Sequence, residues 1–142
     1  MEILLVEDNP VDVVITKEAF NAGRVRNNVH VVEDGEEAMD FLHKRGKYSS
    51  VPTPEIILLD LNLPKKDGRE ILAEVKADPS LRRIPVIVLT TSEDKEDIWR
   101  SYDLQANCFI TKPVDTEQFS RALERVGEFW SSVVRLPIPV KS

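Results

Sequence analysis

The sequence has little of what disulfide-stabilised, redox and histidine-rich metal proteins use. Its 142 residues include one cysteine, Cys108, and two histidines, His30 and His43. A single cysteine excludes an internal disulfide and a Cys-x-x-Cys site, and two histidines are too few for a histidine-based metal cluster. We interpret Cys108 as a buried core residue rather than a nucleophile.

Glycine is scarce, and basic residues are fewer than acidic ones. Five glycines form neither a GxGxxG turn nor a GxxxxGK[ST] loop, which argues against a nucleotide-binding module. Nineteen Lys and Arg stand against 25 Asp and Glu, a formal net charge of -6, and no basic block marks a surface for nucleic acid. We therefore expect no direct nucleic-acid partner.

Long hydrophobic runs are also missing. No apolar stretch approaches the ~20 residues that a membrane-spanning helix requires, and the start MEILLVED lacks the pattern of a signal peptide. We expect a cytoplasmic protein that does not associate with membranes. The composition, 42% hydrophobic and 31% charged residues, is that of a globular chain with one core.

What the sequence does contain is a regular alternation of short apolar runs and longer stretches of helical period. The apolar runs predict strands at 3–6, 28–34, 56–60, 84–90 and 107–111. The helical stretches lie between Pro10 and Gly23 and at 34–45, 67–77, 92–104 and 115–134.

Five βα units are too few for a closed eight-stranded barrel. The predicted fold class is therefore α/β, a single (βα)5 open parallel sheet with helices on both faces. We expect one domain over residues 1–134, followed by a tail, 135–142, whose two prolines prevent continuation of the last helix. No effector domain is expected, so output must come through binding another molecule.

Polar residues collect at the carboxyl ends of the strands, where open α/β sheets bind their ligands. Glu7 and Asp8 follow the first strand, Asp60 ends the third, Thr90 ends the fourth, and Lys112 follows the fifth. In the flavodoxin-like strand order 2-1-3-4-5 the first and third strands are neighbours, whereas in the order 3-2-1-4-5 another strand separates them. The first order predicts that the three carboxylates lie within several ångströms of one another.

Three carboxylates at that spacing repel one another. At ~5 Å and an effective dielectric constant of 20, each pair costs about 3 kcal/mol, which one lysine does not offset for all three pairs. The cluster therefore requires a bound cation. Oxygen ligands at a partly solvated site suit Mg²⁺ better than zinc or iron, and Mg²⁺ usually acts beside phosphate.

Each of these residues also has a simpler structural interpretation. Asp8 could cap the first helix, Asp60 could open a turn, Thr90 could be an ordinary strand-end residue, and Lys112 could be a solvated amine. These interpretations do not explain why an acidic pair, an aspartate, a hydroxyl and a lysine follow successive strands on the same side of the sheet. Their combination favours a functional site.

Four motifs, in this order and spacing, resemble the receiver domains of two-component response regulators. LLVEDNP resembles the acidic pair of that family, LLDLNLPKKDG its phosphoacceptor segment, VIVLTTS its hydroxyl position, and FITKP its lysine-proline pair. Four further segments are more similar still to single-domain regulators associated with bacterial and cyanobacterial phytochromes. They are the loop GKYSSVPTP, the segments DLNLPKKDGRE and SYDLQANCFI, and a terminal FW followed by LPIP.

The resemblance implies a role for each acidic residue. Asp60 matches the aspartate that accepts a phosphoryl group from a phosphohistidine on a sensor histidine kinase, for which a phytochrome is the candidate. Asp8 matches a direct Mg²⁺ ligand, Glu7 a ligand acting through water, and Asn62 the position whose backbone carbonyl binds the metal. The pair is Glu-Asp rather than Asp-Asp, which moves one carboxylate outward by a methylene.

The resemblance also assigns the switch residues. Thr90 matches the hydroxyl that bonds a phosphoryl oxygen after activation, and Lys112 the amine that pairs with the phosphoryl group. The bond before Pro113 matches one that is usually cis in the family. Phe109 lies at the position of an aromatic that turns inward on phosphorylation, and without a hydroxyl it could act only by packing.

A receiver of this kind is a phosphoacceptor signalling protein, not an enzyme beyond its own phosphorylation and dephosphorylation, and it acts on a downstream protein. Trp99 and Tyr102, with the fourth and fifth helices and the tail, could form a homodimer face, although core positions for the aromatics are an equal alternative.

An aspartyl-phosphate phosphatase or phosphotransferase is a second function class. Such enzymes place the nucleophile after the first strand with an aspartate two residues on, whereas Asp60 follows the third strand and position 62 is Asn62. A receiver acting only as an unphosphorylated scaffold is a third alternative, but the loss of site residues expected for it is not seen.

Overall fold

The computed structural model of the chain describes residues 1–21, 27–61, 63, 67–90, 108–111, 121 and 125. Its elements are, in chain order, β1 (Glu2–Val6), α1 (Pro10–Asn21), β2 (Asn28–Val32), α2 (Gly35–Leu42), the 3-10 turn η1 (Gly46–Tyr48), β3 (Ile56–Asp60), α3 (Gly68–Ala77), β4 (Val86–Thr90) and β5 (Cys108–Thr111).

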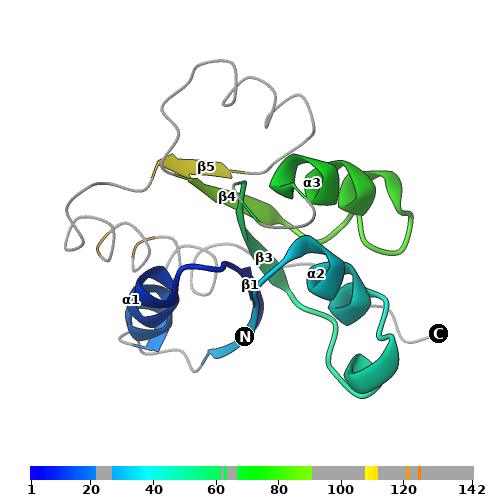
Figure 1. Cartoon of the computed structure of the whole chain (residues 1–142), viewed down its shortest axis with the longest axis horizontal. Coiled ribbons are helices and arrows are strands. Elements are labelled where there is room, and N and C mark those ends of the chain that lie inside the picture. The colour runs from blue at the N-terminus through cyan, green and yellow to red at the C-terminus, as the bar shows by residue number, and fades with distance from the viewer. Residues whose placement is uncertain are drawn as a thin grey trace.

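The strands form one parallel sheet in the order β2-β1-β3-β4-β5. Helix α1 covers one face of this sheet, and α2 and α3 cover the other (Figure 1). The predicted fold class is therefore confirmed, with the flavodoxin-like strand order that makes β1 and β3 neighbours.

Strand β3 lies at the centre of the sheet, and all five of its residues are buried. Successive side chains of a strand point to opposite faces, so β3 contributes to two separate cores. Ile57 and Leu59 belong to the cluster under α2 and α3, whereas Ile56 and Leu58 belong to the cluster under α1. Burial on both faces explains why the strand is a continuous apolar run rather than an alternating one.

Helix α1 begins directly after Asn9, which caps its first turn. The Asn9 side-chain oxygen accepts hydrogen bonds from the backbone N–H groups of Val11, at 2.9 Å, and Asp12, at 3.4 Å. Pro10, which has no N–H to satisfy, is the first helical residue. Because Asn9 is the cap, Asp8 is not used for this purpose.

Helix α2 ends earlier than predicted. The periodicity extends to Arg45, but the helix ends at Leu42, because Lys44 has a left-handed backbone with φ of 56° that cannot continue it. The segment 46–54, predicted to be a loop, begins with η1. Tyr48 of that turn packs against the cluster under α2 and α3.

Helix α3 matches its predicted range, with Asp67 as the cap. The Asp67 carboxylate accepts a hydrogen bond of 2.8 Å from the N–H of Arg69. Ile71, Leu72 and Val75 are buried and hold the helix against the sheet. The cap and these buried side chains therefore fix where α3 begins after β3.

The predicted helix at 92–104, the tail at 135–142 and all but two residues of the predicted helix at 115–134 lie outside the described residues. Those two, Arg121 and Arg125, are helical. Within the described part of the chain, no helix has the length and apolar content needed to cross a bilayer.

Candidate functional site

The carboxyl ends of β1 and β3 bring three carboxylates together. The two strands are paired with Val6 opposite Leu59, so the next residues along them are Glu7 and Asp60. Asp8 follows directly. One carboxylate oxygen from each of these three residues lies within 4.8 Å of the others.

Two of the three carboxylates lie inside the protein. Glu7 is 1% exposed and Asp60 6% exposed, whereas Asp8 is exposed. Glu7 is oriented by its surroundings: its N–H donates to Val32 O at 3.0 Å, and its carboxylate accepts a hydrogen bond of 3.2 Å from the N–H of Asn9. The residue that caps α1 thus also orients a carboxylate of the site.

The donor set fits a small hard cation. With oxygens within 4.8 Å of one another, each carboxylate pair repels by about 3 kcal/mol at an effective dielectric constant of 20. Oxygen ligands about 2.1 Å from Mg²⁺ lie at most about 4.2 Å from each other, so the observed spacing requires only a small adjustment. The exposure of Asp8 leaves one side open to the water ligands that Mg²⁺ usually keeps.

Two other predicted site residues lie at neighbouring strand ends. Thr90 is the last residue of β4, directly after Leu89, which pairs with Asp60, and it pairs with Thr111 of β5. Phe109 lies within β5. The side chains of Thr90 and Phe109 are outside what the structure describes, as are the following residues in full: Asn62, Trp99, Tyr102, Lys112 and Pro113.

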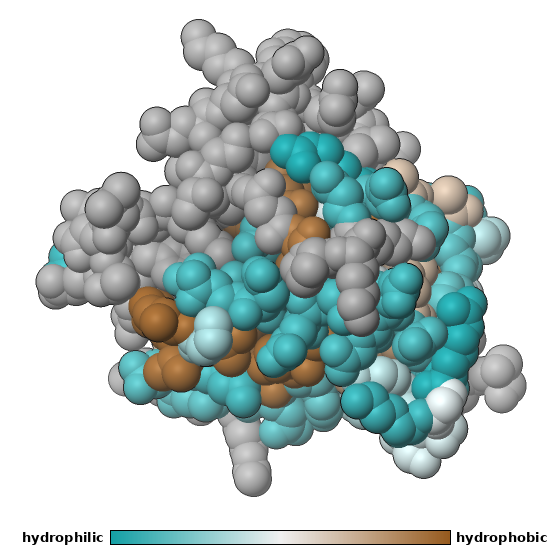
Figure 2. Space-filling model, viewed as in Figure 1, coloured by the Kyte–Doolittle hydropathy of each residue, from teal (hydrophilic) through white to brown (hydrophobic). Residues whose placement is uncertain are grey.

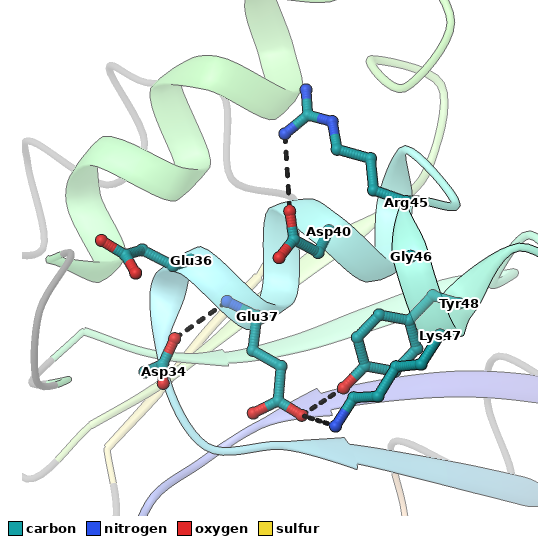
Figure 3. A pocket seen from close by; sticks show the side chains of 8 residues that line it. All are labelled: Asp34, Glu36, Glu37, Asp40, Arg45, Gly46, Lys47 and Tyr48. Carbon is teal, nitrogen blue, oxygen red and sulfur yellow. Dashed lines mark hydrogen bonds and ion pairs between the residues drawn. The ribbon is translucent and has the colours of Figure 1, made fainter.

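A pocket of about 340 Å³ lies beside α2 and η1, and sequence reasoning missed it. Figure 3 shows Tyr48 and Lys47 directed at Glu37: Tyr48 donates a hydrogen bond to the Glu37 carboxylate, and Lys47 Nζ lies 3.7 Å from Glu37 Oε1. Burial and the Glu37 carboxylate raise the pKa of the Tyr48 hydroxyl well above its usual range. The lining residues are Asp34, Glu36, Glu37, Asp40, Arg45, Gly46, Lys47 and Tyr48.

This pocket contains none of the predicted site residues, and both of its basic side chains are paired within it, Arg45 with Asp40 at 3.6 Å and Lys47 with Glu37 at 3.7 Å. The sequence signal for it was the loop composition of GKYSSVPTP, which indicates a connection but not what the connection contacts.

Helix α1 presents apolar side chains beside the site. Val11 and Val14 are 61% and 54% exposed, and Figure 2 shows apolar surface over this helix. Val11 is three residues from Asp8 along the chain and lies in the first turn of the helix that follows the acidic pair.

Comparison with known proteins agrees with this geometry. The sequence matches the response regulator receiver domain over residues 3–124. It is 44% identical over 135 residues to the response regulator Rcp1 of Synechocystis sp., covering 95% of this chain and 92% of Rcp1.

Two solved structures are similar over nearly the whole chain. The phosphorylated cyanobacterial phytochrome response regulator RcpA superposes with a TM-score of 0.93 at 50% identity, covering 96% of this chain and 98% of that one. The Mn²⁺-bound form of Rcp1 gives the same TM-score at 44% identity, with coverage of 96% and 99%. With the five-stranded order and the clustered carboxylates, these matches establish that the chain belongs to the response regulator receiver domain family.

Proposed function

We propose that this chain is a single-domain response regulator whose Asp60 accepts a phosphoryl group from a sensor histidine kinase, with Mg²⁺ bound beside it. The observation that carries the proposal is the convergence of the nearly buried Asp60 with Glu7 and Asp8 at the carboxyl edge of the sheet. In a receiver domain this is the edge at which a phosphoryl donor would meet a carboxylate.

The reacting atom is a carboxylate oxygen of Asp60. It attacks the phosphorus of a phosphohistidine, a P–O bond forms as the P–N bond breaks, and the imidazole leaves. Glu7, Asp8 and the backbone carbonyl of Asn62 would not react but would hold the metal, Glu7 through water. When bound, Mg²⁺ neutralises the carboxylates and the charge that gathers on the equatorial phosphoryl oxygens.

Neighbouring strands supply the remaining groups. Lys112, which follows β5, pairs with the phosphoryl group, and Thr90 at the end of β4 bonds a phosphoryl oxygen after transfer. The register that places Thr90 one residue beyond the partner of Asp60 supports this role. Phe109 is proposed to respond by packing, and the bond before Pro113 is proposed to be cis, as the family resemblance implies.

The kinase is proposed to be a phytochrome, because RcpA, a cyanobacterial phytochrome response regulator, is 50% identical and matches over 96% of this chain. Val11 and Val14 offer the kinase apolar contact beside the acceptor. The protein acts in the cytoplasm as a signalling protein rather than as an enzyme on small substrates.

Output passes from the receiver domain, residues 1–134, to another protein, with the tail at 135–142 as part of the contact surface. A homodimer through the fourth and fifth helices, including Trp99 and Tyr102, is one form of this output. Solution mass measured with and without phosphorylation tests it, and a monomer in both states would exclude it.

The test of the acceptor is intact mass after incubation with acetyl phosphate and Mg²⁺. The wild type should gain the mass of one phosphoryl group, and Asp60→Asn should not, because an amide is too weak a nucleophile. Asp40→Asn is the matched control: it makes the same change on α2, at an aspartate whose side chain is 49% exposed, and should be phosphorylated like the wild type.

Chelation of the metal should abolish the gain in the wild type. If acetyl phosphate gives no gain, the same comparison with a phosphorylated histidine kinase decides the question. Failure with both donors would leave the unphosphorylated scaffold as the better description.

A further inference from the structure

We propose that Gly68 is a positioning residue for the acceptor: it lets the start of α3 rest on the backbone of Asp60 and Leu61 and thereby fixes the Asp60 carboxylate relative to Glu7 and Asp8. The inference rests on the proposed cation site. It concerns a residue that lies eight positions from the acceptor and contributes no side-chain atom to it.

The contact leaves no space for a side chain. A Cβ atom at Gly68 would lie 2.4 Å from Asp60 O, 2.6 Å from Leu61 Cα and 3.1 Å from the Asp60 carbonyl carbon. Carbon atoms in favourable contact are about 3.5–4.0 Å apart, so even a methyl group overlaps the backbone. The Gly68 N–H also donates a 3.0 Å hydrogen bond to Leu61 O, which closes the loop between β3 and α3.

Space, and not backbone conformation, requires glycine at this position. Gly68 is not among the described residues with a positive φ, whereas Gly46 has φ of 55° and a Cβ atom added there would meet no other atom within 4 Å. Glycine thus suits the backbone conformation at position 46 and the lack of space at position 68. Only the one at position 68 touches the backbone of the acceptor.

Helix α3 cannot easily withdraw from an added methyl group. Ile71 and Leu72 are 0% exposed and Val75 is 1% exposed, so moving the helix outward would open the core. Asp67 fixes the first turn by accepting a hydrogen bond of 2.8 Å from the N–H of Arg69.

The peptide between Asp60 and Leu61 is held by β4, where Asp60 pairs with Leu89, but not by β1. The pairing of β3 with β1 ends at Leu59, so on that side Asp60 lies just beyond the ladder. A methyl group at position 68 is therefore relieved by displacement of this peptide, which turns the Asp60 carboxylate. Glu7 is on another strand and stays in place, so the oxygens of the cluster separate.

The experiment is a Mn²⁺ titration in which free Mn²⁺ is counted by electron paramagnetic resonance, together with urea denaturation of each variant. The proteins are the full-length wild type, Gly68→Ala and Val75→Ala. Val75→Ala is the matched control, because it destabilises the same helix from a buried position two turns away from Gly68. A purely structural role for Gly68 would lower stability without a specific effect on the metal.

We expect Gly68→Ala to raise the Mn²⁺ dissociation constant about tenfold, the lower end of the effect of removing an outer-shell support, and Val75→Ala to leave it unchanged. Equal dissociation constants in Gly68→Ala and the wild type, or the same increase in both variants, would overturn the inference. Absence of Mn²⁺ binding in the wild type would instead overturn the proposed cation site. If Gly68→Ala unfolds in buffer, the three proteins are compared in trimethylamine N-oxide, which favours the folded state.

Discussion

Asp60→Asn is expected to stabilise the metal-free protein. The oxygens of Glu7 and Asp60 lie within 4.8 Å in a site where both side chains are nearly buried, a repulsion of about 3 kcal/mol at an effective dielectric constant of 20. The amide removes this repulsion but also weakens other polar interactions of Asp60, so the net gain in unfolding free energy should be about 1–3 kcal/mol.

The assay is urea denaturation in EDTA and again in saturating Mg²⁺. In EDTA the midpoint should rise with an unchanged denaturant slope, the sign of a change in stability alone. In Mg²⁺ the difference should shrink or reverse, because the wild type binds the cation better and gains stability by mass action. Asp40→Asn is the control, since its carboxylate lies 3.6 Å from Arg45 and its loss should not stabilise the protein.

An Asp60→Asn variant no more stable than the wild type in EDTA would refute this reasoning. It would mean that the carboxylates do not repel one another in the metal-free fold. An increase that persists unchanged in Mg²⁺ would show that the repulsion is real but that the cation does not bind there.

Two further predictions concern parts of the fold outside the site. Asp34→Ala should lower the unfolding free energy by about 1 kcal/mol, because it removes the cap of α2, a 2.8 Å hydrogen bond from the N–H of Glu37; thermal denaturation measures it. Hydrogen bonds from Asn28 and His30 hold the pKa of Glu2 below its ordinary value of 4.5, so they stabilise the fold above that pH and the contribution is lost as pH falls through the folded-state pKa. The stability difference between wild type and Glu2→Gln should therefore be largest near neutral pH and shrink in acid; a difference independent of pH would contradict it.

The order of the elements and the carboxylate cluster could be predicted from the sequence because both depend on local patterns. The run IILLD is apolar without alternation, and only a strand buried on both faces explains that pattern at such a length. Once the strands are parallel, their carboxyl ends share an edge, and the order 2-1-3-4-5, in which β1 and β3 are neighbours, places Glu7, Asp8 and Asp60 together.

Other features could not be predicted because they depend on distances that no local pattern contains. The left-handed backbone of Lys44, which ends α2, has no glycine or asparagine to signal it. The contact of Tyr48 with Glu37 joins a loop to a helix eleven residues away. The need for glycine at position 68 becomes visible only when the start of α3 is placed against the end of β3.

The division of β3 between two cores has a consequence for how substitutions combine. Ile57 and Leu58 are adjacent in the chain but belong to clusters on opposite faces of the sheet, separated by the backbone itself. Changes at these two positions should couple less strongly than changes at Ile57 and its partners Leu4 and Val86, because the side chains of Ile57 and Leu58 share no cluster. The two faces can therefore vary in sequence largely independently, while the position of Asp60 at the end of the strand depends on the packing of both.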